Sequence, residues 1–140
     1  MPDLERSFNI KYNDFSKAGE VSIKVQGILK SIGFDPALIR RVSICAYESE
    51  MNVVMHGGDG VVLLTLGKKN VFLDVRDYGP GIDDVELAFK EGYSTATLEH
   101  REMGFGAGMG LPNIKKNADS LEVQSVKGKG THVKMRFKVG

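Results

Sequence analysis

The stretch Glu48-Ser-Glu-Met-Asn52 is the most informative part of this sequence, and three glycine-containing segments follow it along the chain. The stretch falls inside a predicted helix, so Glu48 and Asn52, four residues apart, share one helix face. The later segments are Asp77-Tyr-Gly-Pro-Gly81, Gly104-Phe-Gly-Ala-Gly-Met-Gly110 and Gly128-Lys-Gly-Thr131. Each is weak evidence alone, and the functional interpretation depends on their order and spacing.

A carboxylate and an amide one helical turn apart can divide two tasks. The Asn52 side-chain oxygen is a candidate ligand for Mg²⁺, a hard cation that takes few protein ligands. Glu48 is a candidate general base beside a phosphoryl group. His56 continues the same row, either as a phosphate contact or as an ordinary helix-end side chain. A solvated helix face is the more frequent explanation of this spacing alone, and Glu50 is expected to point elsewhere.

Asp77 follows an apolar strand and precedes two glycines. An ionised carboxylate only accepts hydrogen bonds, so it suits the 6-amino group of adenine. Gly79 and Gly81 let the backbone turn sharply and approach a base closely, and Ile82 completes this predicted pocket. The alternative is a plain turn in which Asp77 caps its own backbone.

Alternating glycines precede the next predicted helix, where backbone amides and the helix N-terminus favour anionic oxygens. The pattern is neither a dinucleotide fingerprint nor a Walker loop. A hairpin turn at Gly128-Lys-Gly130 brings the Thr131 hydroxyl within reach of the same pocket. The residues predicted to cover the phosphates are Gly104, Gly106, Gly108, Met109, Gly110 and Leu111.

The bulk properties favour one cytoplasmic domain spanning residues 1–140, with 41% hydrophobic residues available for a core. A net charge of +1 argues against nucleic-acid binding driven by phosphate neutralisation. No segment has the length of a membrane span or the pattern of a signal peptide. The single cysteine, Cys45, fits a reducing compartment and is expected to be packed rather than reactive.

The predicted elements alternate between helices and paired strands. Asn13, Asp14 and Ser16 offer caps for the first helix, Gly33 ends it, and Asp35-Pro36 starts the second. Strands in pairs with helices between them indicate an α+β two-layer sandwich, with the helices on one face of a mixed sheet. The expected ranges are strands at 8–12, 61–66, 71–75, 121–126 and 131–139, helices up to 31, from 36 to 55 and at 111–118, and a long connection at 78–108 with a short helix near 85–90.

The four segments, in this order, resemble the GHKL superfamily of ATP-binding domains. This group includes histidine kinase catalytic domains, gyrase-type ATPases and small bacterial serine kinases. The stretch from Glu48 to Asn52 looks like the N box, and Asp77 to Gly81 like the first glycine box. Gly108-x-Gly110 looks like the second glycine box, and Thr131 like the threonine contact near the end of these domains.

Two further runs, Asp84–Thr95 and Gly108–Asp119, resemble the stressosome switch-protein kinases and their relatives, the anti-sigma factor kinases. The resemblance implies a Bergerat-type sandwich that uses ATP and Mg²⁺ to phosphorylate serine on a STAS-domain antagonist and exchanges partners with nucleotide state. It also implies a sigma factor or regulatory phosphatase as a further partner, and homodimerisation. Glu48 would be the base and Asn52 the metal ligand.

One departure keeps a second interpretation open. Anti-sigma kinases often carry an arginine in the phosphate cover, but Gly106 stands there and Arg101 is the nearest arginine. Arg101 or Lys115 would then share charge stabilisation with Mg²⁺ and backbone amides. The alternative is a non-catalytic, nucleotide-gated module that sequesters a sigma factor or another regulator. The chain is short for a histidine kinase or a gyrase-type ATPase.

Overall fold

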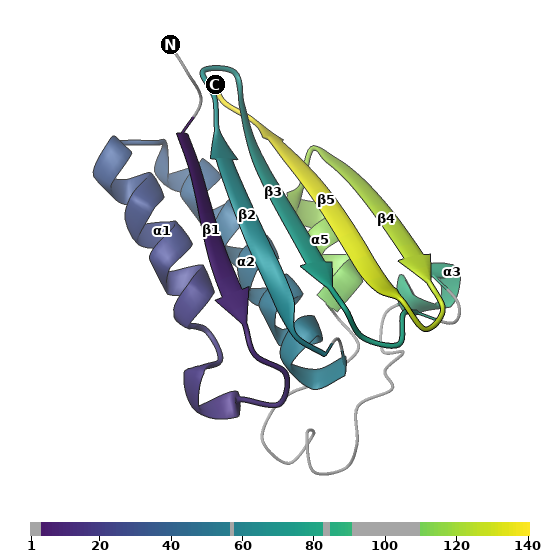
Figure 1. Ribbon diagram of the computed structural model, residues 1–140. Coiled ribbons are helices and arrows are strands. Elements are labelled where there is room, and N and C mark those ends of the chain that lie inside the picture. Colours follow the sequence, from purple (N-terminus) through teal and green to yellow (C-terminus); the bar gives the residue numbers. More distant parts are fainter. Residues whose placement is uncertain (1–3, 57, 83–84, 91–109) are drawn as a thin grey trace.

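The protein forms one five-stranded sheet with helices packed on one of its faces (Figure 1). This computed structural model describes residues 4–56, 58–82, 85–90 and 110–140, with only the backbone for His56 and Glu86. No helix in these ranges is long and apolar enough to cross a bilayer. The elements are β1 (Leu4–Ile10), the 3₁₀ turn η1 (Phe15–Lys17), α1 (Glu20–Ile32), α2 (Pro36–His56), β2 (Gly60–Leu66), β3 (Asn70–Asp77), α3 (Val85–Ala88), α5 (Gly110–Asn117), β4 (Ser120–Val126) and β5 (Gly130–Lys138).

The two-layer α+β arrangement is confirmed, but the sheet is antiparallel throughout the described strands rather than mixed. The strand order is β1-β2-β3-β5-β4, and every neighbouring pair is antiparallel. Strands β3 and β4 run in the same direction, so a parallel pair would need them side by side. Instead β5 lies between them, with Val133 opposite both Val75 and Val123.

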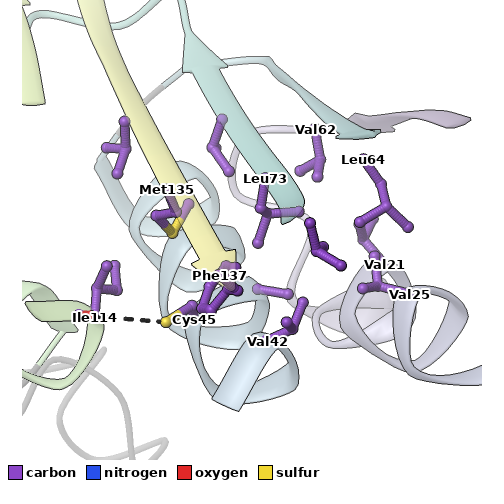
Figure 2. Packing of buried hydrophobic residues seen from close by; sticks show 14 of the residues in the cluster. Val21, Val25, Val42, Cys45, Val62, Leu64, Leu73, Ile114, Met135 and Phe137 are labelled. Atoms are coloured by element: carbon purple, nitrogen blue, oxygen red, sulfur yellow. Dashed lines mark hydrogen bonds between the residues drawn. The ribbon is translucent and has the colours of Figure 1, made fainter. Parts of the chain in front are cut away.

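The core lies between the inner face of the sheet and the three long helices. Alternation in β2 buries every second residue, as expected for a strand with one covered face. A row of side chains crosses the central strands, in which Leu73 is opposite both Leu64 and Met135. Figure 2 shows this row packing against the helices, including Val25 of α1 and Ile114 of α5. Full burial of each such side chain contributes about 1.5–3 kcal/mol.

Cys45 is a packed core residue, as its apolar neighbours predicted. Its side chain is fully buried, and its thiol donates to the Ile114 carbonyl over 3.7 Å (Figure 2). Burial raises the pKa of the thiol to about 12. The reactive thiolate is therefore scarce at neutral pH.

Local sequence signals fix the junction between α1 and α2. Gly33 adopts φ +93°, and its N–H donates to the carbonyls of Leu29 and Lys30. Asp35 Oδ2 accepts from the N–H of Ala37 at 3.1 Å, which caps the start of α2. Both predicted helix boundaries are confirmed.

The N-terminal strand and the start of α1 differ from the prediction. Strand β1 ends at Ile10, because the Tyr12 N–H donates to Asp59 Oδ1 and Asn13 turns the chain with φ +61°. Two of the three expected caps bond each other instead of the helix start. The Ser16 hydroxyl donates to Asp14 Oδ1 at 2.6 Å. The helix begins only at Glu20.

Glu50 supplies the missing cap from α2. Its carboxylate accepts three backbone N–H groups at the start of α1, from Gly19 at 3.0 Å, Val21 at 3.3 Å and Ser22 at 3.0 Å. The side chain is 2% exposed. Glu50 therefore links the start of α1 to α2 by hydrogen bonds. Its side chain points away from the helix face that carries Glu48 and Asn52, as predicted.

Replacing Glu50 with Ala is expected to lower the free energy of unfolding by about 3 kcal/mol, because buried N–H donors lose a charged acceptor. Urea unfolding followed by circular dichroism measures this change. Glu50→Gln keeps one acceptor oxygen and should lose less. A loss below about 1 kcal/mol in Glu50→Ala would contradict this role.

Candidate nucleotide site

The predicted site residues in the described ranges gather at one end of the sheet, the lower end in Figure 1. The chain leaving α2 lies beside the chain leaving β3. A Cβ added to Gly58 would lie 3.2 Å from the Gly79 nitrogen, and the Tyr78 N–H donates to the Asp59 carbonyl at 3.0 Å. This arrangement brings the C-terminal part of α2 next to the turn that contains Asp77.

Glu48 lies half-buried on α2, facing α5. The Asn113 side-chain amide of α5 donates to Glu48 Oε1 at 3.4 Å. Burial raises the pKa of Glu48, and this hydrogen bond partly opposes the rise. A carboxyl with a raised pKa and one oriented oxygen suits a general base. Sequence reasoning missed Asn113; its place one turn into the helix after the glycine run is the signal that could have identified it.

Replacing Glu48 with Gln is expected to raise the melting temperature of the ligand-free protein at pH 7. The folded-state pKa lies above the ordinary value of 4.5, so folding disfavours the ionised form. That cost is complete above the folded pKa and absent below the unfolded one, and Gln never incurs it. Melting curves at pH 7 and pH 4 check the sign. An equal or lower melting temperature at pH 7 would contradict it.

Asn52 and Gly110 meet where α2 and α5 come together. A Cβ on Gly110 would lie 3.2 Å from both the Oδ1 and Nδ2 atoms of Asn52. Because glycine has no side chain, the Asn52 amide can lie beside the N-terminus of α5, where phosphate oxygens are favoured. An amide oxygen in this place fits Mg²⁺, which takes its other ligands from water and phosphates.

Asp77 uses its two carboxylate oxygens differently. Oδ1 accepts the N–H of Gly79 at 3.1 Å and that of Thr131 at 3.2 Å. Oδ2 makes no hydrogen bond within the described residues. The turn interpretation is therefore right for Oδ1, while Oδ2 stays available as an adenine acceptor. Burial raises the pKa of Asp77 and the two N–H donors oppose this.

Ser125 joins the remaining adenine-side residues, and sequence reasoning missed it. Its hydroxyl accepts the Ile82 N–H at 2.7 Å and lies 3.0 Å from Thr131 Oγ1. Gly81 has φ +84°, and a Cβ there would lie 2.8 Å from the Val126 carbonyl. The close approach that requires glycine at 81 is therefore to the end of β4, a structural reason beside the predicted contact with a base.

Several predicted residues have a different position or lie outside the described part of the chain. The side chain of Leu111 is 5% exposed and belongs to the core. Lys115 places its ammonium 5.8 Å from the Phe89 ring centroid. His56 is the last residue of α2, and its side chain is not described. The residues outside the described ranges are Arg101, Gly104, Gly106, Gly108 and Met109.

Comparison with known families agrees with this geometry. Residues 14–137 match the model of the histidine kinase-like ATPase domain. The chain belongs to this family. Nearly every helix and strand lies inside the matched range. The candidate site residues on α2 and α5 and those around Asp77 also lie inside it.

Within this family, the chain is similar to bacterial serine kinases and anti-sigma factors. It is 29% identical to the serine/threonine-protein kinase RsbT of Bacillus subtilis over 112 residues, which is 77% of this chain and 78% of that protein. It is 31% identical to the anti-sigma F factor of Thermoanaerobacter sp. over 113 residues, 76% of each chain. The resemblance to small bacterial serine kinases and anti-sigma factors is confirmed.

A solved structure supports the fold. The crystal structure of the RsbU and RsbW domains of Rv1364c from Mycobacterium tuberculosis superimposes with a TM-score of 0.62 at 18% identity. The alignment covers 99% of this chain and 33% of that one. At this identity the likeness concerns the histidine kinase-like ATPase fold alone.

Proposed function

We propose that this chain is an ATP-dependent protein serine kinase that phosphorylates a STAS-domain protein and changes partners with nucleotide state. One observation carries the proposal: Glu48, held by Asn113, lies one helical turn from Asn52, whose amide is beside the N-terminus of α5. A candidate base, a candidate metal ligand and a helix end that favours anions thus lie close together in a chain of the histidine kinase-like ATPase family, which supports the proposal.

The residues divide into a nucleotide-holding part and a reacting part. Bound Mg-ATP supplies the phosphoryl group. The Oδ2 atom of Asp77 would accept a hydrogen of the adenine 6-amino group, while Oδ1 keeps the turn folded. Asn52 would hold the Mg²⁺ ion through its amide oxygen. The N–H groups at the start of α5, which Gly110 begins, favour phosphate oxygens.

Glu48 handles the proton of the attacking group. A serine hydroxyl placed over this carboxylate gives its proton to Oε2, because Oε1 is engaged by Asn113. The serine oxygen then attacks the terminal phosphorus, and the bond to the ADP oxygen breaks. The raised pKa of Glu48 brings this base closer to the working pH, which favours proton transfer.

Partner capture tests the proposal. The tagged protein is incubated with lysate of the source organism and Mg-ATP or Mg-ADP, and mass spectrometry identifies retained proteins and their phosphosites. The expected result is a STAS-domain protein that carries phosphoserine in the ATP sample only. A sigma factor or phosphatase retained without new phosphate would contradict the kinase and support a sequestering module.

A further inference from the structure

A groove of about 730 Å³ lies between α1 and α2, outside the adenine pocket. Its apolar lining includes Phe34, Ile44 and Tyr47, and Tyr47 is 40% exposed. Lys30 of α1 and Arg40 of α2 are both exposed and also line it. The groove is therefore apolar along its floor and cationic at its rim.

The groove is continuous with the reacting part of the site, because Glu48 is also one of its lining residues. Arg40, Ile44, Glu48 and Asn52 follow at intervals of four along α2, so they form one row on the helix surface. At 1.5 Å per residue, Arg40 lies about 12 Å along the helix from Glu48. A chain segment that enters at Arg40 and follows this row arrives at the base.

Glu48 is held by Asn113, but the two cations that line the groove have no partners in the described part of the chain. Lys30 and Arg40 make no ion pair there. Two free cations beside an apolar floor fit an occupant with apolar and acidic side chains.

We infer that this groove docks the segment of the protein substrate next to its phosphoacceptor serine, with acidic side chains over Lys30 and Arg40. The inference rests on the proposed kinase function. An extended segment advances about 3.3 Å per residue, so an acidic residue about four positions from the serine would reach Arg40 while the hydroxyl faces Glu48. Specificity for the protein is then set by α1 and α2, away from the nucleotide.

Charge reversal tests the groove with the captured STAS-domain protein as substrate. The double variant Lys30→Glu/Arg40→Glu is compared with Lys24→Glu, an exposed lysine of α1 that does not line the groove. Initial rates at varied substrate concentration give KM and kcat, and a fluorescent ADP analogue gives nucleotide affinity. In the double variant we expect KM for the protein to rise at least tenfold, with kcat and nucleotide affinity within twofold of the parent.

Each outcome has one interpretation. A raised KM confined to the double variant supports docking in the groove. If the parent phosphorylates the protein and the double variant keeps the parental KM, the groove is not the docking surface, although the kinase function stands. A rise in KM for Lys24→Glu that equals that of the double variant would also overturn the inference. The loss of a cation outside the groove would then raise KM just as much. If the parent transfers no phosphate, both the kinase function and the groove assignment fail.

Discussion

Glu48→Gln is expected to reduce phosphoryl transfer by about 10²–10⁴-fold while Mg-ATP still binds. Glutamine keeps the size of the side chain and the oxygen that Asn113 contacts. What it loses is the capacity to take a proton from the attacking hydroxyl. The effect should therefore be confined to kcat, since nucleotide affinity depends on groups at Asp77, Asn52 and Gly110.

Single-turnover phosphorylation of the proposed STAS-domain substrate measures this loss, and calorimetry measures Mg-ATP binding by the same preparation. Glu122→Gln is a matched control, because Glu122 is an exposed glutamate on the edge strand β4 whose carboxylate accepts from Gln124 of the same strand. A variant at position 48 that transfers phosphate as fast as the parent would remove Glu48 from the base role. The higher melting temperature expected for this variant at pH 7 separates lost chemistry from lost folding.

Asp77→Asn is expected to weaken ATP and ADP to the same extent, by about 10- to 100-fold in Kd, because a charged acceptor for the 6-amino group is lost. The substitution should change the role of Oδ2 and preserve that of Oδ1. The Asn oxygen can occupy the place of Oδ1 and accept the N–H groups of Gly79 and Thr131. The Asn nitrogen then replaces Oδ2. Its N–H donors would face the N–H donors of the adenine 6-amino group, so no hydrogen bond can form there.

Calorimetric titration with ATP and with ADP checks this expectation, together with a melting curve to show that the turn is intact. Asp74→Asn serves as control, because residue 74 lies three positions earlier on β3 and faces the opposite side of the sheet. Unchanged affinity for both nucleotides would take Asp77 out of the site. Weakening of ATP alone would place it near the terminal phosphate instead.

The features predicted correctly from sequence were those that neighbouring residues determine. Gly33 and Asp35-Pro36 act on backbone groups within a few positions, so the sequence predicts where α1 ends and α2 begins. The hairpin of β2 and β3 and the short helix α3 were likewise predicted close to their observed ranges. The spacing of Glu48 and Asn52 likewise predicted that both lie on one helix, which α2 confirms, while their functional roles stay a prediction.

The missed features depend on residues far apart in the chain. Glu50 caps a helix 31 positions before it, and Asn113 contacts a carboxylate 65 positions away. Ser125 bonds the Ile82 backbone 43 positions away. The antiparallel sheet has the same origin, since β5, the last strand in the chain, lies between β3 and β4 and separates these two strands of equal direction. No local pattern encodes which distant partner a polar side chain will find.

The two carboxylates of the candidate site are supported by different parts of the fold. Asp77 is fixed by the β3 turn and the β4–β5 hairpin, whereas Glu48 is fixed by contact between α2 and α5. Changes in the hairpin should therefore alter how long a nucleotide stays, and changes at the helix contact should alter how fast it reacts. Residence time and turnover can then be adjusted separately, which suits a regulator whose partner is chosen by the nucleotide it holds.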